Sequence, residues 1–122
     1  MSRPARLAFL LLACVPTAAA AGGADVVSVE VRLTGPGVYA FDVTVRHADE
    51  GWDHYADRFE IVGPDGAVLG TRTLLHPHVT EQPFTRSLSD VAIPEDVSEV
   101  VVRAHDSVHG HGGRETTVAL PR

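Results

Sequence analysis

The chain has one cysteine, one methionine and no lysine among its 122 residues. Cys14 and Met1 both lie near the N-terminus, so the rest of the chain can form no disulfide and offers no sulfur ligand to a metal. A metal bound there must be held by imidazole, carboxylate or backbone oxygen. Such a ligand set disfavours Cu(I) relative to Cu(II), Zn(II), Ni(II) or iron.

Long apolar runs are also absent. The run over residues 7–15 is too short to span a bilayer, and it follows the basic residues Arg3 and Arg6. Small residues of the A-x-A type come next, as at a signal-peptide cleavage site. We therefore predict a signal peptide over residues 1–21, one domain over residues 22–122, no membrane span, and a periplasmic or secreted location.

A second interpretation of the N-terminal segment stays open. Leu11-Leu12-Ala13-Cys14 resembles a lipobox, in which the cysteine is lipidated and becomes the new N-terminus. Under this alternative, Cys14 anchors the protein as a lipoprotein.

Positive charge is scarce, because arginine supplies all ten of the Lys and Arg residues. The net charge is −6 from 10 arginines and 16 acidic residues, and it becomes −8 when Arg3 and Arg6 leave with a signal peptide. Such a surface repels phosphate groups, which excludes nucleic acid and disfavours anionic lipid as partners. A metal cation or a basic protein surface is the expected kind of partner.

Helical periodicity is missing after residue 25, where apolar and polar residues alternate in short runs between Gly, Pro and Asp. Val27, Val29, Val31 and Leu33 are expected to face the core in the first run, and Tyr39, Phe41, Val43 and Val45 in the second. The pattern predicts an all-β protein, a seven-stranded antiparallel immunoglobulin-like β-sandwich after an N-terminal signal peptide. The expected strands cover residues 27–33, 39–45, 59–61, 67–75, 84–88, 100–104 and 115–120.

The histidines are placed unevenly along this pattern. Antiparallel strands send every second connection to the same end of a sandwich, so residues 48–57, 76–83 and 106–113 should share one end. All seven histidines lie in or beside these connections: His47, His54, His76, His78, His105, His109 and His111. The alternative is that each histidine is solvated by itself in a polar loop.

Imidazole binds divalent transition metals, and three loops on a rigid sandwich supply converging segments. Carboxylates on the same loops can complete the coordination or orient the imidazole rings. These acidic residues are Asp49, Glu50, Asp53, Asp57, Glu81 and Asp106. The predicted metal ligands are His47, His54, His76, His78, Asp106, His109 and His111, whereas His105 is interpreted as an ordinary strand residue. No catalytic residue is predicted.

Two segments resemble the iron-binding domain of superoxide reductase (desulfoferrodoxin). They are His54-Tyr55, which leads into a strand, and Val102-Arg103-Ala104 followed by Asp106-Ser107-Val108-His109-Gly110. That family is an immunoglobulin-like sandwich whose iron has four histidine ligands and one cysteine in C-x-x-H-G. The resemblance implies that His47, His54 and His109 correspond to histidine ligands.

The chain departs from that family at two ligand positions. Asp106 stands where the family has its cysteine, and no counterpart of the family's first histidine occurs between Gly22 and Arg46. The thiolate ligand sets the electronic properties of the iron, so its loss argues against superoxide reduction.

A second resemblance involves Leu75-His76-Pro77 and Gln82-Pro83-Phe84. These segments are similar to the Z subunit of the periplasmic thiosulfate-oxidising carrier complex, a sandwich that acts as a non-catalytic binding partner. This resemblance implies an adaptor whose histidines are incidental.

The sequence therefore predicts an exported protein that holds a divalent transition metal, namely copper, zinc or iron. Binding or delivery is favoured over catalysis. One alternative is a periplasmic adaptor or sulfur-oxidation carrier-type module that binds another protein. The other is an iron redox protein similar to superoxide reductase but without the cysteine ligand.

Overall fold

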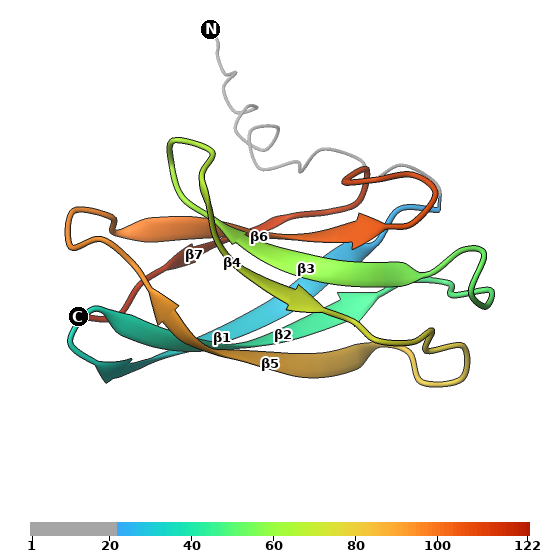
Figure 1. The fold of residues 1–122 in the computed structure, drawn as a ribbon, viewed down its shortest axis with the longest axis horizontal. Helices are drawn as coiled ribbons and strands as arrows, with labels where there is room; N and C mark the ends of the chain where they lie inside the picture. The colour runs from blue at the N-terminus through green and yellow to red at the C-terminus, as the bar shows by residue number, and fades with distance from the viewer. Residues whose placement is uncertain (1–21) are drawn as a thin grey trace, which may run out of the picture.

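A computed structural model of the chain describes residues 22–122, which form seven strands in two antiparallel sheets (Figure 1). One sheet has the order β1-β2-β5 and the other β4-β3-β6-β7. The predicted all-β sandwich is thereby confirmed. The strands are β1 (Asp25–Gly35), β2 (Val38–Arg46), β3 (Ala56–Val62), β4 (Val68–Thr73), β5 (Phe84–Ala92), β6 (Glu99–Asp106) and β7 (Thr116–Ala119).

Within residues 22–122 the structure has no helix of the length and hydropathy needed to cross a bilayer. The predicted signal peptide and the alternative lipid site at Cys14 lie outside the described residues.

The core lies between the two sheets, as alternation in the strands requires. On β2, the side chains of Tyr39, Phe41 and Val43 are at most 1% exposed. They face apolar side chains of the second sheet, among them Phe59 and Ile61, which are fully buried. Burying each such side chain stabilises the fold by roughly 1.5–3 kcal/mol.

The first strand differs from the prediction at its start. Val26 pairs with Val45 but Ser28 pairs with Thr44, so Val27 is the extra residue of a β-bulge. The bulge turns Val26 into the core, where it is 0% exposed, and leaves Val27 only half-buried. The prediction that Val27 faces the core is therefore wrong, because strict alternation does not anticipate a bulge. Leu33, which was also expected inside, is 43% exposed near the second irregularity of this strand, between Leu33 and Gly35.

The fifth strand is longer than predicted and continues past Leu88 to Ala92. A register shift lies between the pairs Tyr39–Val91 and Phe41–Leu88. Asp90 has φ 59° within this irregular stretch, and aspartate is one of the few residues that tolerate the left-handed region. The number of strands is unchanged, so the alternation of their directions is preserved.

The connections divide between the two ends of the sandwich, as Figure 1 shows. Residues 47–55, 74–83 and 107–115 connect strands at one end, which is also where the described chain begins at Gly22. We call this the histidine end, because every histidine lies in or beside one of these loops. The tight turns and the C-terminus lie at the opposite end.

Candidate metal centre

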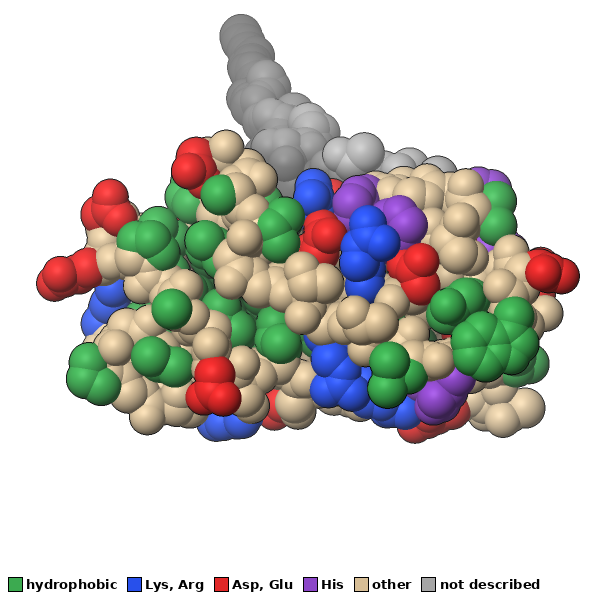
Figure 2. Space-filling view, viewed as in Figure 1, with side chains coloured by type: hydrophobic (Ala, Val, Ile, Leu, Met, Phe, Trp, Pro, Cys, Tyr) green, Lys and Arg blue, Asp and Glu red, His purple; other side chains and the backbone are tan. Residues whose placement is uncertain are grey.

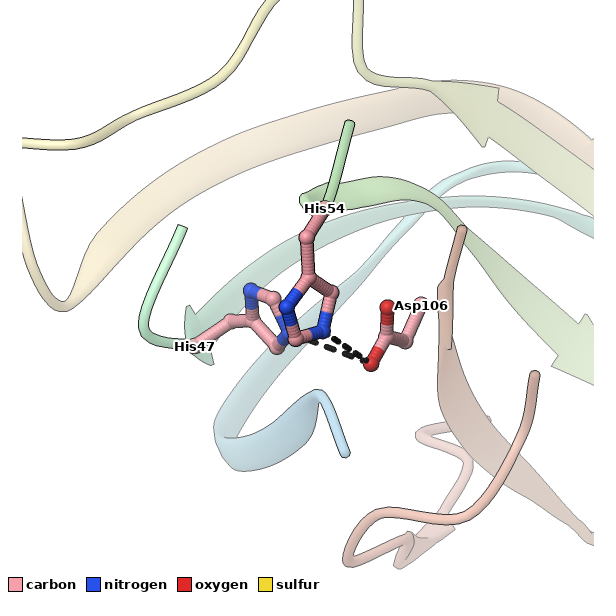
Figure 3. Close-up of side chains that lie close together, drawn as sticks. All are labelled: His47, His54 and Asp106. Atoms are coloured by element: carbon pink, nitrogen blue, oxygen red, sulfur yellow. Dashed lines mark hydrogen bonds and ion pairs between the residues drawn. The ribbon is translucent and has the colours of Figure 1, made fainter. Parts of the chain in front are cut away.

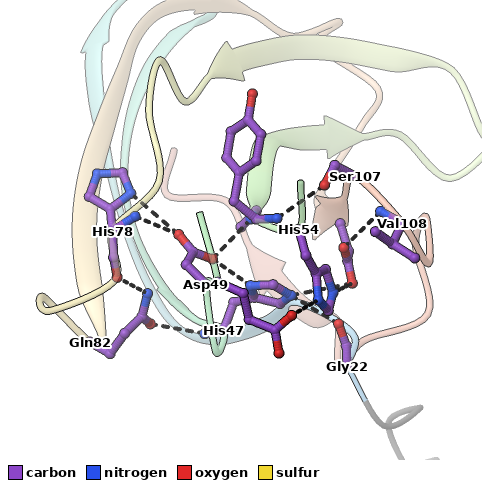
Figure 4. Close-up of polar contacts among 12 residues, drawn as sticks. Gly22, His47, Asp49, His54, His78, Gln82, Ser107 and Val108 are labelled. Carbon is purple, nitrogen blue, oxygen red and sulfur yellow. Dashed lines mark hydrogen bonds and ion pairs between the residues drawn. The ribbon is translucent and has the colours of Figure 1, made fainter. Parts of the chain in front are cut away.

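His47 directly follows β2 and is 3% exposed. Its Nδ1 atom lies 2.5 Å from Asp49 Oδ1, while its Nε2 atom lies 2.9 Å from the Gly22 carbonyl oxygen and 3.3 Å from Asp106 Oδ2. All three neighbours are hydrogen-bond acceptors. Both nitrogens of this buried ring therefore face oxygen atoms (Figure 4).

His54 has the same kind of surroundings. Its Nδ1 atom lies 3.1 Å from Glu50 Oε1, and its Nε2 atom lies 3.0 Å from Asp106 Oδ2. The loop that holds it is closed by a backbone hydrogen bond of 2.8 Å from Glu50 N to the His54 carbonyl. The hydrogen bonds to Asp106 and Glu50 raise the pKa of His54 above its ordinary value.

Asp106 ends β6 and is fully buried between the two rings. Its Oδ1 atom accepts a hydrogen bond of 2.9 Å from Val108 N, which leaves Oδ2 facing both histidines. Burial raises the pKa of Asp106, but hydrogen bonds from Val108, His54 and His47 together lower it by more, to below its ordinary value. The carboxylate is therefore ionised at neutral pH.

Asp49 connects this group to the neighbouring loop. Its carboxylate also accepts hydrogen bonds from Ala56 N at 3.1 Å and from His78 N at 2.6 Å. Gln82 accepts from His47 N and donates to the His78 carbonyl, both at 2.9 Å (Figure 4). Such satisfied buried networks restrict side-chain positions, so His47 is held rigidly.

Within residues 22–122, one group of three or more His, Cys, Asp or Glu residues has ligand atoms that all lie within 4.8 Å of one another. It consists of His47, His54 and Asp106 (Figure 3). Two ligands at about 2.1 Å from a tetrahedral ion lie roughly 3.4 Å apart. The observed distances from Asp106 Oδ2 to the two Nε2 atoms, 3.3 and 3.0 Å, are close to this value.

The chemistry of this group also fits a metal. Two imidazole nitrogens and one carboxylate oxygen suit zinc, Cu(II) or iron. The second nitrogen of each ring is held by a carboxylate, Asp49 for His47 and Glu50 for His54. This is the usual arrangement around histidine ligands, because it fixes the tautomer and aims the other nitrogen at the metal.

His109 lies next to this group on its solvent side. Its ring is 5.1 Å from the ring of His54, centroid to centroid, and the residue is exposed. A Cβ atom built on Gly22 would lie 2.7 Å from His109 Nε2, so Gly22 lies against this ring. The sequence did not identify the Gly22 carbonyl as a neighbour of His47, because a backbone oxygen carries no residue-type signal.

His76 and His78 form a separate pair in the loop after β4, with ring centroids 4.7 Å apart. Arg86 Nη2 lies 3.0 Å from His78 Nε2, and a guanidinium can only donate, so this nitrogen accepts. Burial and the nearby charge of Arg86 lower the pKa of His78. The ring also stacks on Phe84 at 3.9 Å. The structure thus places neither histidine in the group around Asp106.

His105 and His111 form another pair, on the outer face of the β3 and β6 sheet, with ring centroids 4.9 Å apart. His105 Nδ1 lies 2.7 Å from Asp57 Oδ1. His111 Nε2 lies 3.2 Å from Glu60 Oε1, and burial lowers the pKa of His111. Two arginines donate to the same glutamate, which makes this region unlike a cation site.

The seven predicted ligands therefore share one end of the sandwich but not one site. His47, His54 and Asp106 converge, and His109 lies beside them. His76, His78 and His111 belong to two other clusters.

Comparisons with known proteins add two likenesses. No protein-family model matches the chain. Over 95 residues, 78% of this chain, it is 44% identical to a protein of Halomicrobium mukohataei named "Putative lipoprotein". The match covers 46% of that protein, so this chain spans about half the length of its relative.

Among solved structures, a superoxide reductase (neelaredoxin) variant from Archaeoglobus fulgidus in the reduced form is similar, with a TM-score of 0.49 and 15% identity. That likeness covers 80% of this chain and 90% of the other.

Proposed function

We propose that this is an exported protein that binds a divalent transition metal, namely zinc, copper or iron, at its histidine end. The proposed ligands are His47 Nε2, His54 Nε2 and Asp106 Oδ2. His109, whose ring centroid lies 5.1 Å from that of His54, is the proposed fourth ligand. Binding or delivery of the ion is the proposed role.

One observation carries the proposal. In both His47 and His54, the Nδ1 atom contacts a carboxylate and the Nε2 atom faces the same oxygen of Asp106. Four acceptor oxygens thus face the nitrogens of the two rings: Asp49 Oδ1, the Gly22 carbonyl oxygen, Glu50 Oε1 and Asp106 Oδ2. A cation, either protons or a metal ion, is needed to balance them.

The export part of the proposal rests on the sequence and on the relative. The N-terminal 21 residues have the composition of a signal peptide. The name of the Halomicrobium protein supports an exported, lipid-anchored form, in which Cys14 of this chain would carry the lipid. N-terminal mass spectrometry of the protein from its native compartment distinguishes a chain that starts near Gly22 from one that starts at a lipidated Cys14.

The metal proposal is tested by titrating the purified exported protein with zinc and Cu(II) in competition with a chelator of known affinity. We expect one ion per chain. His54→Ala removes a proposed ligand whose side chain is 16% exposed. Asp106→Asn replaces the carboxylate by an uncharged amide of nearly the same size. Each should weaken binding by more than about 100-fold, because removing even an outer partner of a ligand costs 10–100-fold.

His76→Ala is the matched control, since this exposed histidine lies in the same end of the sandwich but outside the group. Thermal unfolding of each variant checks that it is folded. A parent protein that binds no ion would contradict the proposal. So would a loss of affinity in His76→Ala as large as that in His54→Ala.

A further inference from the structure

The histidine end carries most of the strongly exposed apolar side chains of residues 22–122. Four large apolar residues there are more than half exposed, and we call them the apolar rim: Trp52 at 67%, Leu75 at 75%, Val79 at 57% and Val108 at 57%. They come from all three loops of this end. Green side chains at the right of Figure 2 show part of the rim, near the purple histidines.

The remaining exposed large apolar residues among those described are Leu33 at 43% and Val68 at 46%. They lie at the far end of β1 and at the start of β4, away from the histidine end. Single exposed apolar residues are common on protein surfaces. A group of them on one surface indicates a site that contacts a membrane or another molecule.

Trp52 is the most informative member of the rim. Its indole packs edge-on against Tyr55, with ring centroids 5.6 Å apart, yet two thirds of its surface is exposed. Packing within the loop therefore covers only a small part of this side chain. Trp and Tyr are enriched where an apolar phase meets water, because one part of each ring system is apolar and another is polar.

The N-terminal segment enters the fold at this same end and is fixed there. The Gly22 carbonyl accepts from His47, and a Cβ atom on Gly23 would lie 2.8 Å from Gly113 N. Gly22 and Gly23 therefore pack closely against the histidine end. The C-terminus lies at the other end, where the Tyr39 hydroxyl donates to the Pro121 carbonyl (Figure 1).

Only seven residues, 15–21, separate Cys14 from Gly22. Fully extended, the eight residue steps from Cys14 to Gly22 span at most about 29 Å. A lipid on Cys14, as the name of the relative suggests for that protein, would hold the histidine end within that distance of a bilayer and leave the C-terminal end farther away.

We propose that the apolar rim docks on a lipid surface of uncharged, zwitterionic phospholipid. Anionic head groups are disfavoured because Glu50, Asp53 and Glu81 are exposed on the same loops. This proposal rests on the lipid-anchored form of the proposed exported protein. It uses none of the metal ligands, so its failure would leave the metal proposal unaffected.

The test uses Trp52, the single tryptophan, as the probe. A chain that starts at Cys14 contains every described core residue, from Ala24 to Leu120, and Cys14 is its one thiol. Coupling this thiol to a maleimide lipid in phosphatidylcholine vesicles reproduces the anchor with its natural tether. Because interfacial tryptophan lies at head-group level, we expect brominated phosphatidylcholine to quench the Trp52 fluorescence at least about twofold.

The matched control carries Cys14→Ser and one cysteine added after Arg122, so that the same vesicles hold the opposite end. We expect little quenching in this control. Leu75→Ser with Val79→Ser should reduce the quenching of the Cys14-anchored chain, whereas Leu33→Ser with Val68→Ser should leave it unchanged. Equal quenching from both anchors, or none from either, would overturn the proposal.

Discussion

The Asp49→Asn substitution tests whether the buried carboxylate behind His47 both supports the fold and orients the proposed ligand. Asp49 has a fully buried side chain, and its two oxygens accept from His47, Ala56 and His78. Asparagine has one acceptor oxygen. If that oxygen replaces Oδ1, the new amide group faces the backbone N–H of His78 at 2.6 Å. The opposite orientation leaves two donors without an acceptor.

At least one buried donor therefore loses its partner, which costs about 1–3 kcal/mol of unfolding free energy. The ring of His47 also loses the charge that fixes its tautomer, and we expect zinc to bind about 10–100-fold more weakly. That loss corresponds to about 1.4–2.7 kcal/mol of binding free energy.

Two measurements separate these effects. Urea unfolding, followed by Trp52 fluorescence with a chelator present, gives the stability without metal. Chelator competition gives the zinc affinity. Glu50→Gln is the matched comparison at His54, because its side chain is 68% exposed. We expect it to change stability by no more than about 0.5 kcal/mol while weakening zinc binding. An Asp49→Asn variant with the unfolding midpoint and the zinc affinity of the parent would refute the reasoning.

Two further predictions follow from other contacts. Gly22→Ala should displace His109, because Gly22 has φ +84° and a Cβ atom there would lie 2.7 Å from the ring; chelator competition should show weaker zinc binding, and an unchanged affinity would exclude His109 as a ligand. Burial raises the pKa of Glu60, but hydrogen bonds from Arg103 and Arg58 lower it by more, to below 4.5. The stability from this group is present above pH 4.5 and is lost as pH falls through the lowered folded-state pKa. Unfolding free energies measured across this pH range should therefore fall less steeply for Glu60→Gln than for the parent, and parallel curves would contradict the assignment.

Much of the fold was predictable because alternation is local. Tyr39 and Phe41 fall on buried positions, as their spacing predicts. The errors lie at bulges, where one residue is added without a signal in the alternation. Val27 is such a residue.

The candidate site was predictable only in part. Counting strands placed the histidines at one end, and the acidic residues beside them were expected to orient rings, as Asp49 and Glu50 do. The spacing of residues in the sequence did not show that Arg86 donates a hydrogen bond to His78 Nε2. Nor did it show that His111 lies beside Glu60, because each of these contacts joins different loops or strands.

The sequence by itself determined the all-β class, the seven strands and the end at which the histidines gather, because those features follow from a two-residue period and from turns that each involve a few neighbouring residues. The tertiary structure decided which histidines meet. Asp106 faces His47 and His54 only because β6 ends beside the loop that follows β2, and the Gly22 carbonyl reaches His47 only because the chain enters at that point. Such distances depend on how two sheets pack, and the spacing of residues along a chain does not specify them.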